Sequence, residues 1–205
     1  MKNWLEKLQK TFGLDACSHA LFYEFEFALR FELGGEEFGM NQPIRRFLQA
    51  HQRASTIAKT TFKNATNVQA VIKSWGNNEG PASDFSRLKF ALPEVGRGDF
   101  AEFTQSDPDE DQREFWHVAP IYDALQISEL LWLDIAKDMP VEPASYGHNT
   151  WLVNFEQEII LHAYDDRGLN VISTKKETLQ PLYEKFSDWL LDYDRHKMDA
   201  VFKTP

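Results

Sequence analysis

The stretch IILHAYDDRGLNVIS, residues 159–173, indicates the fold of this chain more clearly than any other part of it. Its apolar halves predict strands at Ile159 to Tyr164 and at Leu169 to Ser173, separated by a tight turn. The tip Asp166-Arg167-Gly168 fits a three-residue hairpin loop in which Gly168 adopts a left-handed conformation beside a bulge. Because links this short cannot form parallel crossovers, we expect an antiparallel meander that includes an upstream strand, Trp151 to Phe155.

Apolar periodicity elsewhere predicts an α+β fold. Residues 25–33 alternate between apolar and polar side chains, which indicates a strand with one buried face. Residues 42–64 lack helix breakers after Pro43, and apolar residues recur at helical spacing, so a long helix is expected. Shorter helices are expected at 3–12 and 127–137, and further strands at Val68 to Trp75 and Phe115 to Tyr122.

The C-terminal region predicts a further helix. Thr174-Lys175-Lys176-Glu177 fits the capping box, but Pro181 conflicts with one continuous helix. We therefore expect a short helical turn followed by a helix that restarts at Pro181. The predicted fold is an antiparallel sheet of about five or six strands, with a long helix (about 42–64) and a C-terminal helix (about 181–202) packed on it.

The 205 residues suit one α+β domain, residues 1–205, with a long irregular segment at 76–114. Glycines and prolines are frequent in that segment, and one short helix is expected near Ser86 to Leu92. The acidic run at 107–111 is expected to be a solvated loop. A connection of this length is unusual within a compact domain, so it is either functional or mobile.

Composition excludes several classes of protein. A 42% apolar share with 16 Phe, 6 Trp and 6 Tyr excludes global disorder. We find neither a secretory signal at the N-terminus nor the ~18 uninterrupted apolar residues of a membrane helix. The single cysteine, Cys17, cannot form an intramolecular disulfide, which favours a reducing compartment and a cytoplasmic location.

The charge is unevenly distributed. The chain carries a net charge of −10, which argues against binding of polyanions by the protein as a whole. Between Phe38 and Asn78, however, there are six basic residues and no Asp or Glu, so the remainder carries −16. The basic residues expected on the helix, as possible phosphate or partner contacts, are Arg45, Arg46, Arg53, Lys59 and Lys63.

The turn is the first candidate for chemistry. Asp165 and Asp166 could form a metal-binding or acid–base pair, but adjacent strand residues point to opposite faces unless the turn redirects them. We interpret Tyr164, Asp165, Asp166, Arg167 and Gly168 as a structural turn. A link to the last helix is also possible, with Arg167 reaching Asp192 or Asp194 and with Arg195 near them.

The histidines and the cysteine give little evidence of a catalytic or metal-binding site. Alternation along residues 159–164 predicts that His162 is a partly exposed sheet residue. Cys17 and His19 could suggest a thiol and an imidazole, but neighbours in sequence seldom form a catalytic pair. No zinc-ligand spacing, phosphate loop or nucleophile motif is present, so we assign no catalytic residue, metal or cofactor, and enzyme activity has no positive support.

Three segments together carry a family resemblance: Arg30-Phe31-Glu32-Leu33-Gly34, Tyr164-Asp165-Asp166-Arg167-Gly168, and residues 189–195 with the sequence WLLDYDR. With these segments, and with the Thr-Leu-x-Pro-Leu-Tyr element at 178–183, the chain resembles the uncharacterised bacterial family known as domain of unknown function 3885. The match is best over residues 145–202. The resemblance implies no established activity, although some relatives are labelled as prophage DNA-binding proteins.

The charge distribution and the turn suggest three functions. The favoured one is a protein-binding module, like nuclease inhibitors and immunity proteins, whose acidic surface docks a basic protein partner. The alternative is a nucleic-acid-associated protein that acts through residues 42–64. The third is an enzyme of unknown class that uses the turn at Asp165 and Asp166, which predicts a cleft around these two residues.

Overall fold

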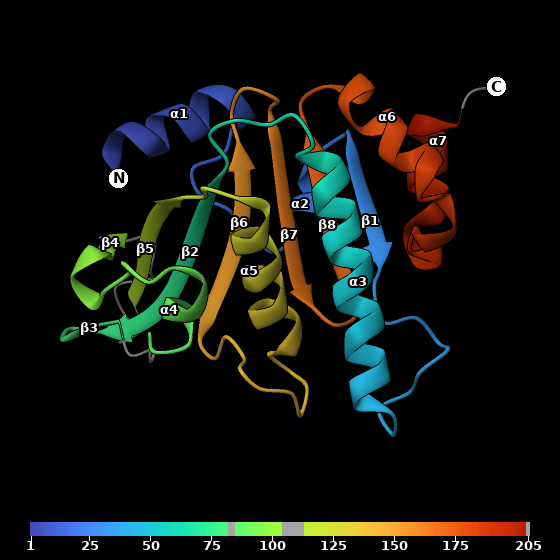
Figure 1. The fold of residues 1–205 in the computed structure, drawn as a ribbon. Coiled ribbons are helices and arrows are strands. Elements are labelled where there is room, and N and C mark those ends of the chain that lie inside the picture. The colour runs from blue at the N-terminus through green and yellow to red at the C-terminus, as the bar shows by residue number, and fades with distance from the viewer. Residues whose placement is uncertain (82–84, 104–112, 204–205) are drawn as a thin grey trace.

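The computed structural model describes residues 1–81, 85–103 and 113–203 (Figure 1). Within these ranges eight strands form one sheet in the order β1-β8-β7-β6-β2-β5-β4, and β3 pairs with β2 beside this path. The strands are β1 Ala28–Glu32, β2 Gln69–Asn77, β3 Gly80–Pro81, β4 Ala101–Phe103, β5 Arg113–Pro120, β6 His148–Asn154, β7 Ile159–Asp165 and β8 Gly168–Ser173.

The helices pack on both faces and at one edge of this sheet. In Figure 1, α3 and α5 lie in front of the strands, while α2 lies behind them and α6 and α7 lie beside β1. The helices are α1 Lys2–Phe12, α2 Leu21–Glu24, α3 Pro43–Thr61, α4 Leu88–Ala91, α5 Ala124–Ala136, α6 Lys176–Lys185 and α7 Arg195–Phe202, with 3-10 turns η1 Arg97–Asp99, η2 Ser187–Trp189 and η3 Asp192–Asp194.

The α+β class and the antiparallel sheet are confirmed. Each of the paired strands in the described residues runs antiparallel to its neighbour, and β6, β7 and β8 form the expected meander. The strand count is higher than the five or six expected. The two extra strands, β3 and β4, are short and lie in the segment that was predicted to be irregular, where Gly and Pro obscure the alternation of period two.

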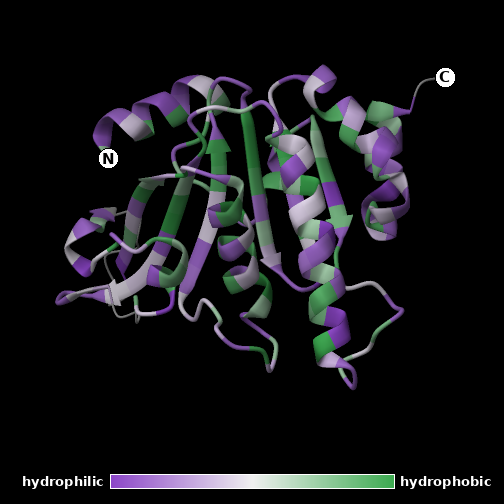
Figure 2. Cartoon of the chain, viewed as in Figure 1, coloured by the Kyte–Doolittle hydropathy of each residue, from purple (hydrophilic) through white to green (hydrophobic). Residues whose placement is uncertain are grey.

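The long helix forms as predicted. Pro43 occupies its first turn, and apolar residues at helical spacing (Phe47, Ala50, Ala54, Ala58 and Phe62) are at most 8% exposed. Figure 2 shows apolar stretches in the central strands β2, β6 and β7, and polar and apolar residues mixed along α3. Burial of one face of each helix against the sheet provides the main hydrophobic contribution to stability.

The C-terminal helix differs from the prediction. Helix α6 begins before Pro181 and continues through it to Lys185, and the chain then bends through η2 and η3 before α7. The bend has a tertiary cause: the backbone N–H of Leu191 donates to the carbonyl of Arg30 at 2.8 Å, and Leu190 forms a bridge with Phe31. The capping box is also absent, since the Thr174 hydroxyl donates to the Glu158 carboxylate.

Among the helices in the described ranges, none combines the length and the apolar character that a membrane crossing requires. The acidic run at 107–111, which was predicted to be a solvated loop, lies outside the described residues.

Candidate functional site

The turn between β7 and β8 is tighter than predicted. Asp165 pairs directly with Gly168, so the loop contains only two residues, and a bulge lies in β7 between Ala163 and Asp165. Gly168 is not among the described glycines with a positive φ, so the prediction of a left-handed Gly168 is wrong. A Cβ at position 168 would lie 1.9 Å from the Tyr164 hydroxyl oxygen. Glycine is therefore required here because the Tyr164 phenol packs against the backbone.

Asp165 and Asp166 are both buried, at 2% and 5% exposure, yet they serve different partners. Asp165 accepts from the backbone N–H of Arg167 at 2.7 Å and from its Nε at 2.9 Å, which closes the turn. Asp166 forms an ion pair with Arg46, which also donates to the carbonyls of Gly35 and Phe38. The two carboxylates therefore pair with different cations, Asp165 with Arg167 of the turn and Asp166 with Arg46 of α3.

The link from the turn to the C-terminal region exists, but Arg30 makes it and Arg167 does not. Arg30 Nη1 lies 3.0 Å from the Asp194 carboxylate and Nε lies 3.3 Å from the Tyr164 hydroxyl. Asp194 is only 1% exposed, so Arg30 neutralises a buried charge. The expected pairing of Arg167 with Asp192 or Asp194 is replaced by its pairing with Asp165, which is closer in sequence.

Asp192 and Arg195 were also predicted to lie near this link between the turn and the last helix. Arg195 donates to the Asp199 carboxylate at 2.8 Å and to the Ser187 carbonyl at 2.7 Å, which stabilises α7 and the preceding bend. Asp192 is exposed in η3. Among the described residues, neither Asp192 nor Arg195 has a hydrogen bond or an ion pair with the turn.

A cleft of about 680 Å³ opens beside the turn, and we call it the hairpin cleft. Its walls come from the N-terminal segment, β1, the end of α5 and the turn, so residues far apart in sequence meet here. The described residues that line it are His19, Arg30, Glu32, Arg46, Lys137, Asp138, Tyr164, Asp165, Arg167 and Leu191.

Cationic groups in the hairpin cleft retain free donors. Lys137 Nζ donates to Asn149 at 2.9 Å, and the Arg167 side chain is 72% exposed even though it pairs with Asp165. Among the described residues, Arg30 Nη2 and Arg167 Nη1 make no hydrogen bond. The carboxylates fix the guanidinium planes while leaving N–H groups available to a ligand.

His162 is fully buried, so the prediction of a partly exposed residue is wrong. Its ring stacks on Trp151 with centroids 4.7 Å apart, and its Nδ1 lies 2.8 Å from the Thr150 carbonyl oxygen. Burial lowers the pKa of His162 to about 3, so the ring is neutral. The predicted alternation of side chains between the two faces of β7 was correct. The face that carries His162 is buried because the N-terminal segment around His19 covers it.

His19 lines the hairpin cleft and contacts the buried His162. Its Nδ1 lies 3.2 Å from His162 Nε2, and its ring packs at 5.7 Å from Trp151. Partial burial and then the nearby ammonium groups of Lys137 and Lys73 lower the pKa of His19. His19 is therefore neutral at neutral pH while remaining open to the cleft.

The basic residues of α3 separate into two groups. Arg46 binds Asp166, and Arg53 donates to the carbonyls of Glu32 and Leu33 at 3.2 and 3.3 Å, so both are occupied within the chain. Arg45 is exposed, with its guanidinium 6.0 Å from the Phe38 ring.

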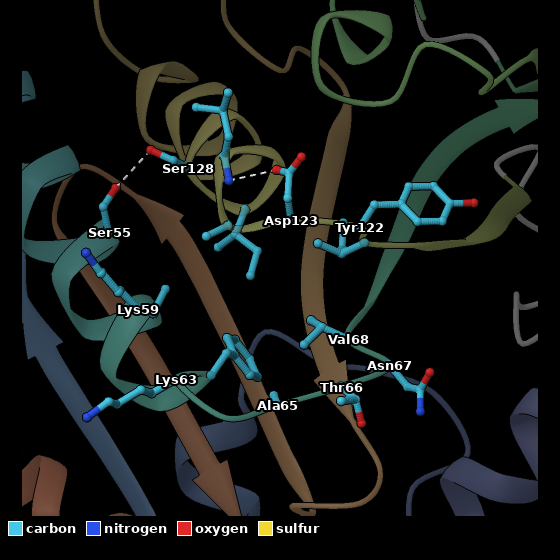
Figure 3. A pocket seen from close by; sticks show the side chains of 16 residues that line it. Ser55, Lys59, Lys63, Ala65, Thr66, Asn67, Val68, Tyr122, Asp123 and Ser128 are labelled. Carbon is cyan, nitrogen blue, oxygen red and sulfur yellow. Dashed lines mark hydrogen bonds between the residues drawn. The ribbon is translucent and has the colours of Figure 1, made fainter.

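Lys59 and Lys63 line a different pocket, of about 800 Å³, between α3 and α5. They stand on its α3 side, and Tyr122 and Asp123 stand on the opposite side (Figure 3). The five predicted contacts therefore do not form one phosphate-binding surface.

Sequence reasoning missed Arg30, His19 and Lys137 as members of one site. Arg30 occupies a polar position of a correctly predicted strand, and a basic residue on a half-buried strand is a signal that it has an acidic partner. His19 and Lys137 carry no comparable local signal, because only the tertiary fold places them beside the turn.

The three sequence motifs, at residues 30–34, 164–168 and 189–195, each contribute residues to this cleft. A family model described as a domain of unknown function (DUF3885) matches residues 5–194. The chain belongs to this family. The match includes every described residue that lines the hairpin cleft of this DUF3885 chain.

The similarity to a curated relative covers only part of the chain. The uncharacterized protein YnaE of Bacillus subtilis (strain 168) is 36% identical to this DUF3885 chain over 74 residues, which are 34% of the chain and 35% of the relative. The chain thus matches about a third of that relative's length. No solved structure matches it.

Proposed function

We propose that this protein binds a small anionic ligand, such as a phosphate-bearing molecule, in the hairpin cleft. The observation that carries the proposal is the convergence of Arg30, Lys137 and Arg167, from three separate elements, on one cleft. Arginine N–H groups in a fixed orientation suit a phosphate or carboxylate, because two parallel hydrogen bonds can form to two oxygens.

The buried carboxylates support this proposal. Asp194 and Asp165 hold the guanidinium groups of Arg30 and Arg167 in fixed orientations before any ligand arrives. A preorganised site loses less side-chain entropy on binding than a mobile pair of surface arginines would. A buried ion pair is weak evidence for a purely structural role, so these pairs are consistent with a role in ligand recognition.

The experiment is a titration of the protein with inorganic phosphate, followed by calorimetry and by amide chemical shifts. We expect saturable shifts around Tyr164 to Gly168 and around His19, and their loss in Arg167→Gln. Arg45→Gln is the matched control, because it removes an exposed arginine outside the cleft. Equal binding by both variants, or no saturable binding by the native protein, would refute the proposal.

A second candidate is the protein-binding function predicted from charge and aromatic content. It is favoured by exposed apolar side chains on α4 and α5, because exposed apolar patches often mark sites where partner proteins bind. Phe90 and Leu125, at 63% and 66% exposure, border a small pocket with Trp132 and Glu129. The net charge of −10 suits a basic partner, such as the target of an inhibitor or immunity protein.

A pull-down from native cytoplasm at low and moderate salt tests this second candidate. We expect a basic protein to be retained by the native chain and lost with Leu125→Glu. Tyr193→Glu is the control, since Tyr193 is 80% exposed but lies at the C-terminal region. Retention that is equal in both variants would refute the helical face as the docking surface.

The nucleic-acid alternative has less support. With Arg46 and Arg53 occupied within the chain, Arg45, Lys59 and Lys63 remain as exposed basic residues of this region. Electrophoretic mobility shifts at low salt test it, and the absence of binding there would exclude it.

A further inference from the structure

The two histidines at the hairpin cleft form a hydrogen-bonded pair whose proton positions follow from one carbonyl group. A carbonyl oxygen can only accept, so His162 Nδ1, at 2.8 Å from the Thr150 oxygen, carries a hydrogen. In a neutral imidazole the other nitrogen is then an acceptor. His162 Nε2 therefore accepts a hydrogen bond from its neighbour.

That neighbour is His19. Because His162 Nε2 accepts, His19 Nδ1 must donate across the 3.2 Å that separates the two nitrogens. The neutral His19 ring then bears its lone pair on Nε2. His19 is exposed at the cleft, whereas His162 is 0% exposed, so Nε2 of His19 is the basic atom that a ligand can reach.

We infer that His19 Nε2 is the proton acceptor of the hairpin cleft and that His162 is the residue that positions it. The inference rests on the proposed function, because it makes the anionic ligand a substrate or a molecule with an acidic hydrogen. In the step proposed, an O–H bond of water or of a ligand hydroxyl breaks and its proton forms an N–H bond on Nε2. The oxygen keeps the electron pair and becomes a nucleophile beside the bound anionic group.

The surroundings of His19 suit this role. Charged and titratable groups face His19 from every neighbouring element, and the cations that lower its pKa are the ammonium groups of Lys137 and Lys73. Cations nearby keep the imidazole unprotonated and stabilise the negative charge that develops on the oxygen. The groups that face His19 are Lys73 of β2, Glu114 of β5, Lys137 and Asp138 after α5, His162, Tyr164 and Asp165 of β7, Arg30 and Glu32 of β1, Arg46 of α3 and Arg167 of the turn.

Long-range ¹H–¹⁵N spectra of the histidine rings test the inference on the native protein. We expect neutral His19 to be protonated on Nδ1, with an acceptor-type ¹⁵N shift at Nε2 and a pKa below 6.5. A neutral His19 protonated on Nε2 would overturn the inference. The exposed His196 serves as an internal reference.

Two variants separate positioning from mere packing. His162→Phe keeps a ring against Trp151 but removes the acceptor, so we expect the His19 tautomer to change; an unchanged tautomer would refute the role of His162. If that core variant does not fold, Lys137→Met replaces a partly exposed cation and should raise the pKa of His19, whereas Lys59→Met should not. An unchanged pKa in Lys137→Met would contradict the electrostatic environment on which the inference depends.

A phosphate titration in the same spectra distinguishes this inference from the proposed function. If phosphate shifts Nε2 and the expected tautomer is present, both are supported. If the tautomer is present but phosphate has no effect, the ligand class is refuted while the proton acceptor is retained. If phosphate binds but Nε2 carries the hydrogen, the ligand class is retained and the proton acceptor is refuted.

Discussion

Replacing Gly168 with alanine tests whether the packing of Tyr164 against the turn holds the hairpin cleft together. The new Cβ would lie 1.9 Å from the Tyr164 hydroxyl oxygen, 2.5 Å from its Cζ and 3.0 Å from the Phe31 carbonyl oxygen. The phenol must therefore move away, and the close contact with the backbone of β1 remains. When Tyr164 moves, its hydroxyl also loses the hydrogen bond from Arg30 Nε.

The expected cost follows from these contacts. Overpacking of this kind costs about 1–3 kcal/mol, and the lost hydrogen bond costs about 1 kcal/mol more. The free energy of unfolding should then fall by about 2–4 kcal/mol. For a chain of this size, each kcal/mol lowers Tm by about 2–4 °C, so calorimetry should show a decrease of roughly 4–16 °C. Urea denaturation provides an independent measurement of the free energy.

Gly98→Ala is the matched control, because a Cβ at Gly98 would meet no atom within 4 Å. It should change the stability by less than about 0.5 kcal/mol. Combining Gly168→Ala with Tyr164→Ala removes the clash with the phenol, so the cost of the double variant should be clearly smaller than the sum of the single costs. Additive costs, or a Gly168→Ala variant as stable as Gly98→Ala, would refute the packing role assigned to Tyr164.

Three further measurements address the charged groups. Asp194→Asn leaves the guanidinium of Arg30 without its carboxylate and should lower the free energy of unfolding by about 3 kcal/mol, whereas the exposed neighbour change Asp192→Asn should be nearly neutral in urea denaturation. Burial raises the pKa of Asp134 from 3.8 to about 7, so the unfolded chain loses this proton first and the stability falls as the pH rises from about 4 through 7, by up to roughly 4 kcal/mol. Asp134→Asn should flatten that part of the stability–pH curve, and an unchanged curve would contradict the assignment. Arg167→Gln should abolish phosphate binding and should also lower the free energy of unfolding by about 1–3 kcal/mol, because it leaves the buried Asp165 carboxylate without its cation.

Local patterns in the sequence predicted most of the fold. The meander of β6, β7 and β8 and the helix α3 follow from alternation and helical spacing, which need only neighbouring residues. The path after Lys185 could not be predicted in this way. It depends on the hydrogen bond from Leu191 to Arg30, which joins residues far apart in sequence and outweighs the helical preference of the intervening residues.

The candidate site was predicted only in part. The residues of the turn were identified, but their partners were not, because Asp166 pairs with Arg46 and Asp194 pairs with Arg30 across more than 100 residues. His162 was assigned to the correct face of its strand. What the sequence could not show is that the segment around His19, at the opposite end of the chain, covers that face and changes an exposed ring into a buried one.

The contact between the C-terminal segment and β1 has a consequence for solubility. Strand β1 ends the sheet, and its outer side would present free backbone N–H and C=O groups if Leu190 and Leu191 did not lie against it. Exposed edge strands recruit strands from other molecules and promote aggregation. A chain cut before Ser187 should therefore form sheet-rich aggregates during expression. The bend that interrupts the last helix protects the sheet from such intermolecular pairing.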